Sequence, residues 1–209
     1  MKMNLPNKLT ILRLILVPVF MAVMLIPCFV DLKYVTYVVF QLLGAALFIG
    51  ASVTDLLDGR IARKYGLVTD LGKFLDPLAD KFMVIGALLC IFFANRHINS
   101  LTILYFAALI VVIFREFAVT SIRLIASSKK GIVIAANILG KIKTVTQIVA
   151  VSAAIIEPVL ISFFRNVPAW AINFPPITVT AMAVMMFFTI YSGANYIRGG
   201  WQYIKDDNE

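Results

Sequence analysis

Four aspartates set between two apolar segments constrain this chain more than any other feature. Asp55 and Asp58 are three residues apart, and Asp76 and Asp80 are four apart. Such offsets place both members of a pair on one face of a helix, where like charges repel. The segments on either side are almost wholly apolar, and four aspartates in a membrane cost on the order of 10 kcal/mol if nothing offsets them. The carboxylates must therefore face a polar cavity or an interface and must be balanced by positive charge.

Carboxylate oxygens are hard ligands suited to Mg²⁺, Mn²⁺ or Ca²⁺. Magnesium typically binds through one or two carboxylates together with the phosphates of a substrate. The aspartate pairs therefore predict a divalent metal site that serves a phosphate-containing ligand. The structural alternative is a solvated acidic turn between two membrane helices.

Long apolar segments identify an integral membrane protein. Of the 209 residues, 61% are hydrophobic and only 14% are charged, which is too little polar surface for a soluble domain. Six segments are long enough to cross a bilayer as helices, and they predict an all-α fold in one domain, residues 1–209. The expected spans are Leu9–Pro27, Tyr34–Ala62, Leu71–Ala94, Leu101–Ala126, Ala135–Phe163 and Ile177–Ile204.

Two local features refine where the expected helices begin and end. Asn7 is an acceptable N-cap for a first helix that begins at Lys8 or Leu9, because Pro6 disfavours helix before it. The segment Asn166–Pro176 contains three prolines and is expected to be an irregular connection at the outer interface.

The distribution of basic residues predicts the orientation. The chain carries 19 Lys and Arg and a net charge of +8, but no long basic run that would indicate nucleic-acid binding. Only Lys33, Arg96 and Arg165 fall on the side opposite the N-terminus. By the positive-inside rule, both termini and the aspartates are expected on the cytoplasmic side.

The aspartates form part of a longer pattern that resembles a known family. Asp55-x-x-Asp58-Gly59-x-x-Ala62-Arg63, eight residues, then Gly72-x-x-x-Asp76-x-x-x-Asp80 is similar to the signature of the CDP-alcohol phosphotransferases at all eight fixed positions. The resemblance implies two divalent cations, Mg²⁺ or Mn²⁺, and a hydroxyl that attacks the β-phosphorus of a CDP-linked lipid and releases CMP.

The resemblance also implies roles for individual residues. The metal ligands would be Asp55, Asp58, Asp76 and Asp80, and Asp80 would also act as the catalytic general base. The contacts to the CDP-lipid would come from Asn7, Thr10, Gly59, Arg63, Thr69 and Gly72.

A second polar group of residues is basic. Arg115 and Arg123 lie on roughly the same side of the fourth span, and Lys141 and Lys143 lie early in the fifth. Cations on two neighbouring helices near the cytoplasmic end predict a pocket that binds the phosphate of an anionic acceptor. In the alternative, Arg115 pairs with an acid and the lysines reach lipid headgroups.

The acceptor region extends the resemblance. REFAVTSIRLIA, GIVIAANILGKIKTVTQ and the opening NLPNKLTILR are similar to the bacterial CDP-diacylglycerol–glycerol-3-phosphate 3-phosphatidyltransferases. This similarity implies transfer of a phosphatidyl group from CDP-diacylglycerol to glycerol-3-phosphate by a multi-pass enzyme of the cytoplasmic membrane, expected to be a homodimer. The alternatives are the same chemistry with serine, inositol phosphate or phosphatidylglycerol as acceptor, or a cation transporter.

Overall fold

The computed structural model describes residues 4–64, 69–130, 138–164 and 167–204. Within these ranges it does not describe the side chains of residues 5–6, 56–64, 70–71, 73, 127–130 and 202–204. The described residues form α-helices joined by short connections and one 3₁₀ turn. The elements are α1 (Leu5–Leu25), η1 (Ile26–Cys28), α2 (Tyr34–Lys64), α3 (Asp70–Ala94), α4 (Asn99–Lys130), α5 (Ile138–Ser162), α6 (Ala169–Asn173) and α7 (Pro176–Ile204).

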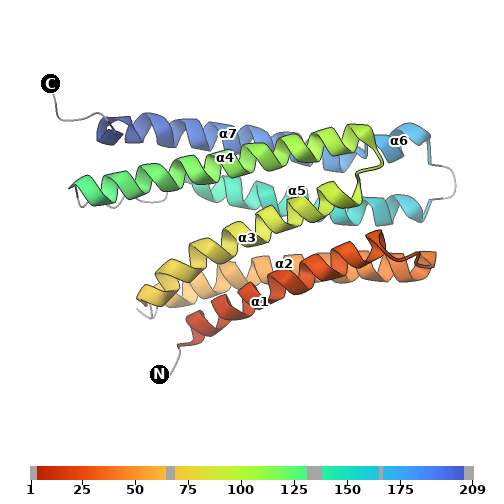
Figure 1. Cartoon of the computed structure of the whole chain (residues 1–209), viewed down its shortest axis with the longest axis horizontal. Coiled ribbons are helices and arrows are strands. Elements are labelled where there is room, and N and C mark those ends of the chain that lie inside the picture. Colours follow the sequence, from red (N-terminus) through yellow and green to blue (C-terminus); the bar gives the residue numbers. More distant parts are fainter. Residues whose placement is uncertain (1–3, 65–68, 131–137, 165–166, 205–209) are drawn as a thin grey trace.

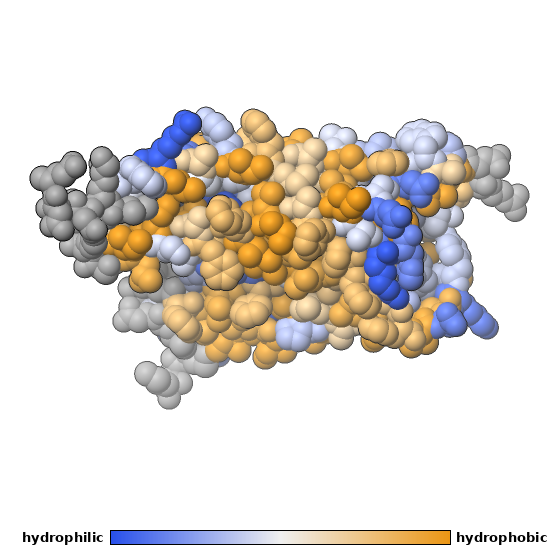
Figure 2. Space-filling model, turned by 45° about the horizontal axis from the view of Figure 1, so that its top comes forward, coloured by the Kyte–Doolittle hydropathy of each residue, from blue (hydrophilic) through white to orange (hydrophobic). Residues whose placement is uncertain are grey.

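The prediction of six membrane-spanning helices is confirmed at the level of length and composition. Within the described ranges, six helices are long and apolar enough to cross a membrane. They are the long helices α1 to α5 and α7, which run roughly along one axis (Figure 1). Figure 2 shows an apolar surface across the middle of one face, with polar side chains gathered toward the ends. This distribution suits a bilayer core bounded by water on both sides.

The helices pack as two groups of three. On one side α1 packs against α2 and α3, and on the other α4 and α5 both pack against α7. Contacts of α3 with α4 and of α2 with α5 join the two groups. Both the start of α1 and the end of α7 lie at the same end of the bundle (Figure 1). The core between the groups is apolar and includes Phe48, Leu88, Ile91, Tyr105, Ile155 and Met182, each 1% exposed or less.

The first helix begins earlier than the sequence predicts. Helix α1 starts at Leu5, with Asn4 in the extended N-cap conformation, so the prediction that Asn7 caps a helix starting at Lys8 or Leu9 is wrong. Proline is tolerated in the first helical turn because the N–H that it lacks has no intrahelical acceptor there. Pro6 therefore lies inside the first turn instead of preceding the helix.

The connection predicted to be irregular contains a short helix. Helix α6 occupies Ala169–Asn173, and Pro168 holds the N-cap position. The following helix starts at Pro176, and a carboxylate from α5 caps it. Glu157 Oε1 and Oε2 accept hydrogen bonds from the backbone N–H groups of Ile177 at 3.0 Å and Thr178 at 2.5 Å. Those donors have no intrahelical acceptor, so Glu157 ties the start of α7 to α5.

Candidate active site

Three of the four predicted aspartates have described side chains, and they come from two helices. Asp55 lies on α2, and Asp76 and Asp80 lie one turn apart on α3. The side chain of Asp55 is 28% exposed, and Asp76 is exposed. Asp55 and Asp80 line the same cavity, which has a volume of about 710 Å³. The tertiary fold therefore brings together carboxylates that are 25 residues apart.

Helix α1 presents a polar face to these carboxylates, formed by Asn7, Thr10 and Arg13. The three residues are spaced three apart and are buried. Thr10 Oγ1 donates a hydrogen bond of 2.5 Å to Asp76 Oδ1, and Arg13 Nη1 forms an ion pair with Asp55 Oδ1. We call these three residues the α1 polar face. Thr10 was predicted to contact the CDP-lipid, whereas Arg13 was not predicted as a site residue at all.

The start of α3 is fixed against the same face. Thr69 Oγ1 accepts a hydrogen bond from the backbone N–H of Gly72 at 3.1 Å and donates one to Asn7 Oδ1 at 2.8 Å. Thr69 is the N-cap of α3. A Cβ atom at Gly72 would lie 3.0 Å from Asn7 Oδ1, 3.3 Å from Thr69 Oγ1 and 4.0 Å from Asp76 Oδ2. Glycine therefore leaves a small space among polar groups, beside one of the predicted metal ligands.

Three predicted residues fall at positions without described side chains. Asp58, Gly59 and Arg63 belong to α2, but their side chains lie outside the described part of the structure. Among the side chains that are described, no group of three or more His, Cys, Asp or Glu residues is close enough together to hold a metal ion. The predicted metal set includes Asp58, so the described residues form only part of it.

The chemistry of the described donors fits a divalent cation. Asp55 and Asp80 offer carboxylate oxygens from two helices to one cavity, and such oxygens suit Mg²⁺ or Mn²⁺. Asp76 is held by Thr10 from a third helix. Hydrogen bonding of this kind orients metal-ligating carboxylates in proteins.

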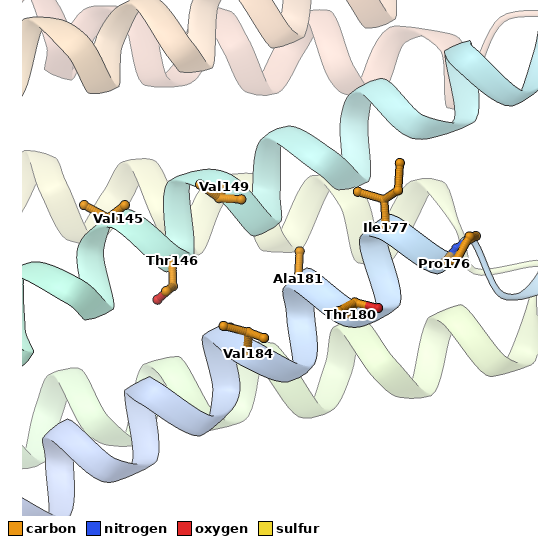
Figure 3. A pocket seen from close by; sticks show the side chains of 8 residues that line it. All are labelled: Val145, Thr146, Val149, Pro176, Ile177, Thr180, Ala181 and Val184. Carbon is orange, nitrogen blue, oxygen red and sulfur yellow. The ribbon is translucent and has the colours of Figure 1, made fainter.

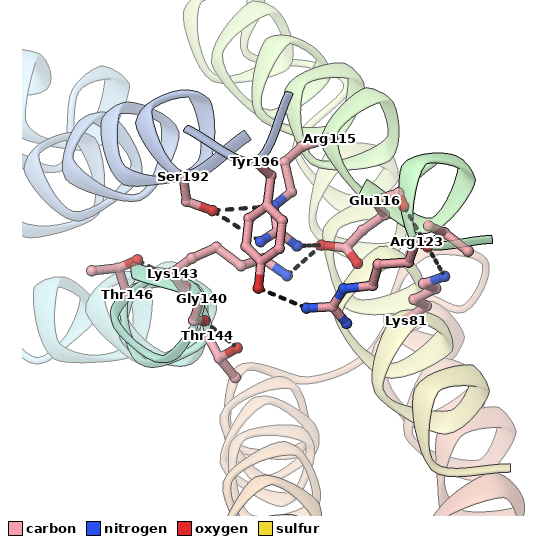
Figure 4. Close-up of polar contacts among 11 residues, drawn as sticks. Lys81, Arg115, Glu116, Arg123, Gly140, Lys143, Thr144, Thr146, Ser192 and Tyr196 are labelled. Carbon is pink, nitrogen blue, oxygen red and sulfur yellow. Dashed lines mark hydrogen bonds and ion pairs between the residues drawn. The ribbon is translucent and has the colours of Figure 1, made fainter. Parts of the chain in front are cut away.

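The opposite side of the cavity is formed by α4, α5 and α7 (Figure 4). We call it the cationic wall, because it carries Arg115, Arg123, Lys141 and Lys143. Arg115 Nη1 donates to Glu116 Oε1 at 2.9 Å, and Lys143 Nζ forms an ion pair with the same oxygen. Arg123 Nη2 donates to Tyr196 Oη at 2.8 Å. The guanidinium carbons of Arg115 and Arg123 lie 5.8 and 5.1 Å from the centre of the Tyr196 ring. One carboxylate is therefore shared by two buried cations, with an aromatic ring beside them.

The predicted acceptor residues all line this cavity, but they differ in exposure. Lys143 is 4% exposed and Arg115 is 9% exposed, whereas Arg123 and Lys141 are exposed. The prediction that Arg115 pairs with an acid and the prediction that it lines a pocket both hold, because Glu116 is itself part of the wall. Lys143 pairs with Glu116 inside the bundle, so the alternative in which it reaches lipid headgroups is wrong.

Sequence reasoning missed several residues around this cavity. Ser192 Oγ accepts hydrogen bonds from Arg115 Nη2 at 2.9 Å and Nε at 3.3 Å. A Cβ atom at Gly193 would lie 3.1 Å from Arg115 Cγ, so glycine leaves room for the arginine. Lys81, which follows Asp80, donates to Thr120 Oγ1 at 2.7 Å and lines the cavity. The pair Ser192-Gly193 within an apolar helix was the available signal on α7.

An apolar groove adjoins the polar cavity. It lies between α5 and α7, has a volume of about 550 Å³ and is lined mainly by aliphatic side chains (Figure 3). Val145 lines both the groove and the polar cavity. From Val145 the groove runs along α5 toward Pro176 and Ile177 at the start of α7 (Figure 3). The polar cavity and the apolar groove therefore share Val145 as a lining residue.

Comparison with known proteins adds a family to this geometry. The family model described as CDP-alcohol phosphatidyltransferase matches residues 3–191. The CDP-diacylglycerol–glycerol-3-phosphate 3-phosphatidyltransferase of Bacillus subtilis (strain 168) is 43% identical over 208 residues, which cover 98% of this chain and 99% of the relative. The protein of the same name from Rickettsia typhi is 37% identical over 73% of this chain and 76% of its own.

A third relative has a different name. A probable phosphatidylglycerophosphate synthase of Mycobacterium tuberculosis (strain ATCC 25618 / H37Rv) is 33% identical over 93% of this chain and 80% of its own. The family model covers the aspartate helices and the basic residues of α4 and α5 and ends at residue 191, before Ser192 and Tyr196, whereas the alignment with the Bacillus subtilis relative covers 98% of the chain. The chain belongs to the CDP-alcohol phosphatidyltransferase family.

Proposed function

We propose that this protein transfers the phosphatidyl group of CDP-diacylglycerol to glycerol-3-phosphate, giving phosphatidylglycerophosphate and CMP. The observation that carries the proposal is one cavity with two unlike walls. Asp55 and Asp80 stand on one side, and Arg115, Lys143 and Tyr196 stand on the other. A carboxylate that can accept a proton thus faces cations that can hold a phosphorylated acceptor. The names of the relatives support the same pair of substrates.

The transfer is a direct displacement at phosphorus. The acceptor hydroxyl gives its proton to Asp80 while its oxygen forms a bond to the β-phosphorus of CDP-diacylglycerol. The bond from that phosphorus to the bridging oxygen breaks, and CMP leaves with the electron pair. Proton transfer requires that the base lie within hydrogen-bond reach of the hydroxyl. The position of Asp80 supports this role, because it lines the cavity beside the cationic wall.

Two divalent cations are proposed to be held by Asp55, Asp58, Asp76 and Asp80. When bound, such cations neutralise the diphosphate and make its phosphorus more electrophilic. Thr10 donates a hydrogen bond to Asp76 from α1, so one of the proposed ligands is oriented by another helix. Asn7, Thr69 and Gly72 form a compact polar corner beside Asp76. We assign this corner, with Thr10, Gly59 and Arg63, to the CDP moiety.

The cationic wall is proposed to bind the phosphate of the acceptor. Arginine presents a planar set of donors that matches phosphate oxygens, and lysine provides a compact positive charge. On the cationic wall Arg115, Arg123, Lys141 and Lys143 supply four positive charges and Glu116 supplies one negative charge; with Lys81, Asp55 and Asp80 the whole cavity keeps a net charge of +2. The net positive charge favours an anionic acceptor over serine, because a zwitterion gains less from it.

The apolar groove between α5 and α7 is proposed to hold an acyl chain of the lipid substrate. The argument is continuity, because Val145 belongs to both the groove and the polar cavity. A lipid whose headgroup occupies the cavity can extend a chain along Val149 and Val184 without crossing a polar surface.

The six apolar helices and the basic residues near one side support a multi-pass protein of the cell membrane with both termini in the cytoplasm.

The proposed function is tested by CMP release from purified protein in detergent. CDP-diacylglycerol is supplied with Mg²⁺ or Mn²⁺ and with one acceptor at a time: glycerol-3-phosphate, serine, inositol phosphate or phosphatidylglycerol. We expect metal-dependent release with glycerol-3-phosphate alone and its loss in Asp80→Asn. Release with a different acceptor would preserve the aspartate chemistry and overturn the assignment of the cationic wall. No release from folded protein with any acceptor would overturn the proposal and favour cation transport.

A further inference from the structure

Arg13 is a buried charge that the proposed reaction leaves unused. It lies in the apolar helix α1, is 1% exposed and is followed one and two turns later by the buried residues Val17 and Phe20. A guanidinium in such surroundings is costly unless it is paired. Among the described side chains it forms an ion pair with Asp55, 42 residues later in the chain. The pair therefore joins α1 to a residue proposed to hold metal.

The ion pair of Arg13 and Asp55 differs in its location from an ordinary salt bridge on a protein surface. Arg13 is buried, whereas Asp55 is partly exposed and lines the cavity. The guanidinium thus contacts the carboxylate from within the bundle, and the cavity meets it from another side. Thr10, one turn earlier, holds Asp76 in the same way from the same helix face. Two successive turns of α1 therefore engage one carboxylate from α2 and one from α3.

We propose that Arg13 is a positioning residue for phosphatidyl transfer, with two separable actions on Asp55. The planar fork of its guanidinium, which contacts Asp55 Oδ1 through Nη1, fixes the position of the carboxylate, and its positive charge offsets the repulsion among the aspartates when no metal is bound. The inference rests on the proposed metal-dependent transfer. It adds that a permanent positive charge, the Arg13 guanidinium, lies beside the exchangeable metal ions. This guanidinium lowers the affinity for metal but raises turnover.

The opposition follows from elementary electrostatics. A fixed positive charge beside a cation site weakens the binding of a divalent cation, even at the effective dielectric constant of a partly buried site. Removing the charge therefore tightens metal binding. Removing the fork releases Asp55 from one orientation, and misplacement of a catalytic group by about 1 Å can cost about 100-fold in rate. Lysine keeps the charge but lacks the fork, whereas glutamine loses the charge.

The experiment compares Arg13→Gln and Arg13→Lys with the wild-type protein and with Lys8→Gln. Lys8 is exposed on the same helix, so its replacement removes one positive charge from α1 without touching the site. Mn²⁺ affinity is measured by the electron paramagnetic resonance signal of free Mn²⁺ in detergent. Turnover and KM are measured by CMP release at saturating Mn²⁺, and the melting temperature is measured with and without Mn²⁺.

For Arg13→Gln we expect the Kd for Mn²⁺ to fall about tenfold while kcat falls at least tenfold and KM for glycerol-3-phosphate changes less than about threefold. Its melting temperature should fall without metal and recover partly with Mn²⁺, because ligand binding stabilises the native state. Arg13→Lys should keep the wild-type Mn²⁺ affinity and still lose turnover. Lys8→Gln should match the wild type in all three measurements.

Three results would overturn the inference. Weaker or unchanged Mn²⁺ binding by Arg13→Gln would refute charge compensation, and wild-type turnover in Arg13→Lys would refute the orienting fork. An equal loss of melting temperature with and without Mn²⁺ would reduce the pair to a structural contact. If Arg13→Gln does not fold, Arg13→Lys still tests the fork. Failure of the proposed function is distinguishable, because the wild-type protein would then neither bind Mn²⁺ at this site nor release CMP.

Discussion

Replacing Lys143 by methionine tests whether this lysine of the cationic wall binds the acceptor or only neutralises Glu116. Lys143 is 4% exposed and pairs with Glu116, which also accepts from Arg115. A hydrogen bond between charged groups contributes about 1.5–3 kcal/mol, which corresponds to about 10- to 150-fold in affinity. If Lys143 holds the acceptor phosphate, Lys143→Met should raise KM for glycerol-3-phosphate by that factor and change kcat less than about threefold.

A second variant separates binding from neutralisation. In Lys143→Met combined with Glu116→Gln, the lysine and the charge of its carboxylate partner are both absent, so no unpaired acid remains. If Lys143 binds the acceptor, KM stays high in the double variant. The assay is CMP release over a range of glycerol-3-phosphate concentrations. Lys33→Met is the control, because Lys33 precedes α2 while Asp55 at the cavity lies about six turns later. A KM for the double variant within about twofold of the wild type would refute the assignment.

Three further changes test other parts of the structure. Gly72→Ala places a Cβ atom 3.0 Å from Asn7 Oδ1, so we expect CMP release to fall about tenfold. The control is Gly50→Ala, whose Cβ atom meets nothing within 4 Å and which should leave CMP release unchanged. Equal activities of the two variants would show that the polar corner is not needed. Glu157→Gln weakens the cap of α7 and should lower the free energy of unfolding by about 1–3 kcal/mol with unchanged KM, as followed by thermal melting and CMP release; an unchanged melting temperature would contradict the importance of the cap. Ala181→Trp fills the apolar groove and should raise KM several-fold for long-chain but not short-chain CDP-diacylglycerol, and an equal effect on both would remove the acyl chain from the groove.

The number and placement of the long helices could be predicted because apolar length is a local property. The third helix was expected to begin at Leu71 and begins at Asp70, and both the prediction and the structure end it at Ala94. The first helix was placed three or four residues too late, because Pro6 was interpreted as preceding a helix that in fact includes it. The short helix α6 was missed because five residues between prolines carry little periodic signal.

The site could be predicted only where its residues form a pattern within one or two neighbouring helices. The aspartate pairs have that property, and so do the basic residues of α4 and α5. The partners of these residues come from further away: Arg13 reaches Asp55 across 42 residues, and Arg115 reaches Ser192 across 77. Arg13 was used only as one of the charges that predict the orientation, and no local pattern pointed to its pairing with Asp55. Tyr196 lies in the last third of the chain, where no motif directed attention to it.

The α1 polar face has a consequence for how the protein enters the membrane. Arg13 leaves the ribosome 42 residues before Asp55, an interval of about 2–8 s at about 5–20 residues per second. During that interval Arg13 lies in an apolar span without its partner, at a cost of up to about 2.5–3.5 kcal/mol, the value for an arginine at the centre of a membrane helix. The high mean hydropathy of this span, 2.6, opposes that cost, and pairing with α2 removes it. Insertion of α1 and α2 together as a helical hairpin is therefore favoured over insertion of α1 alone.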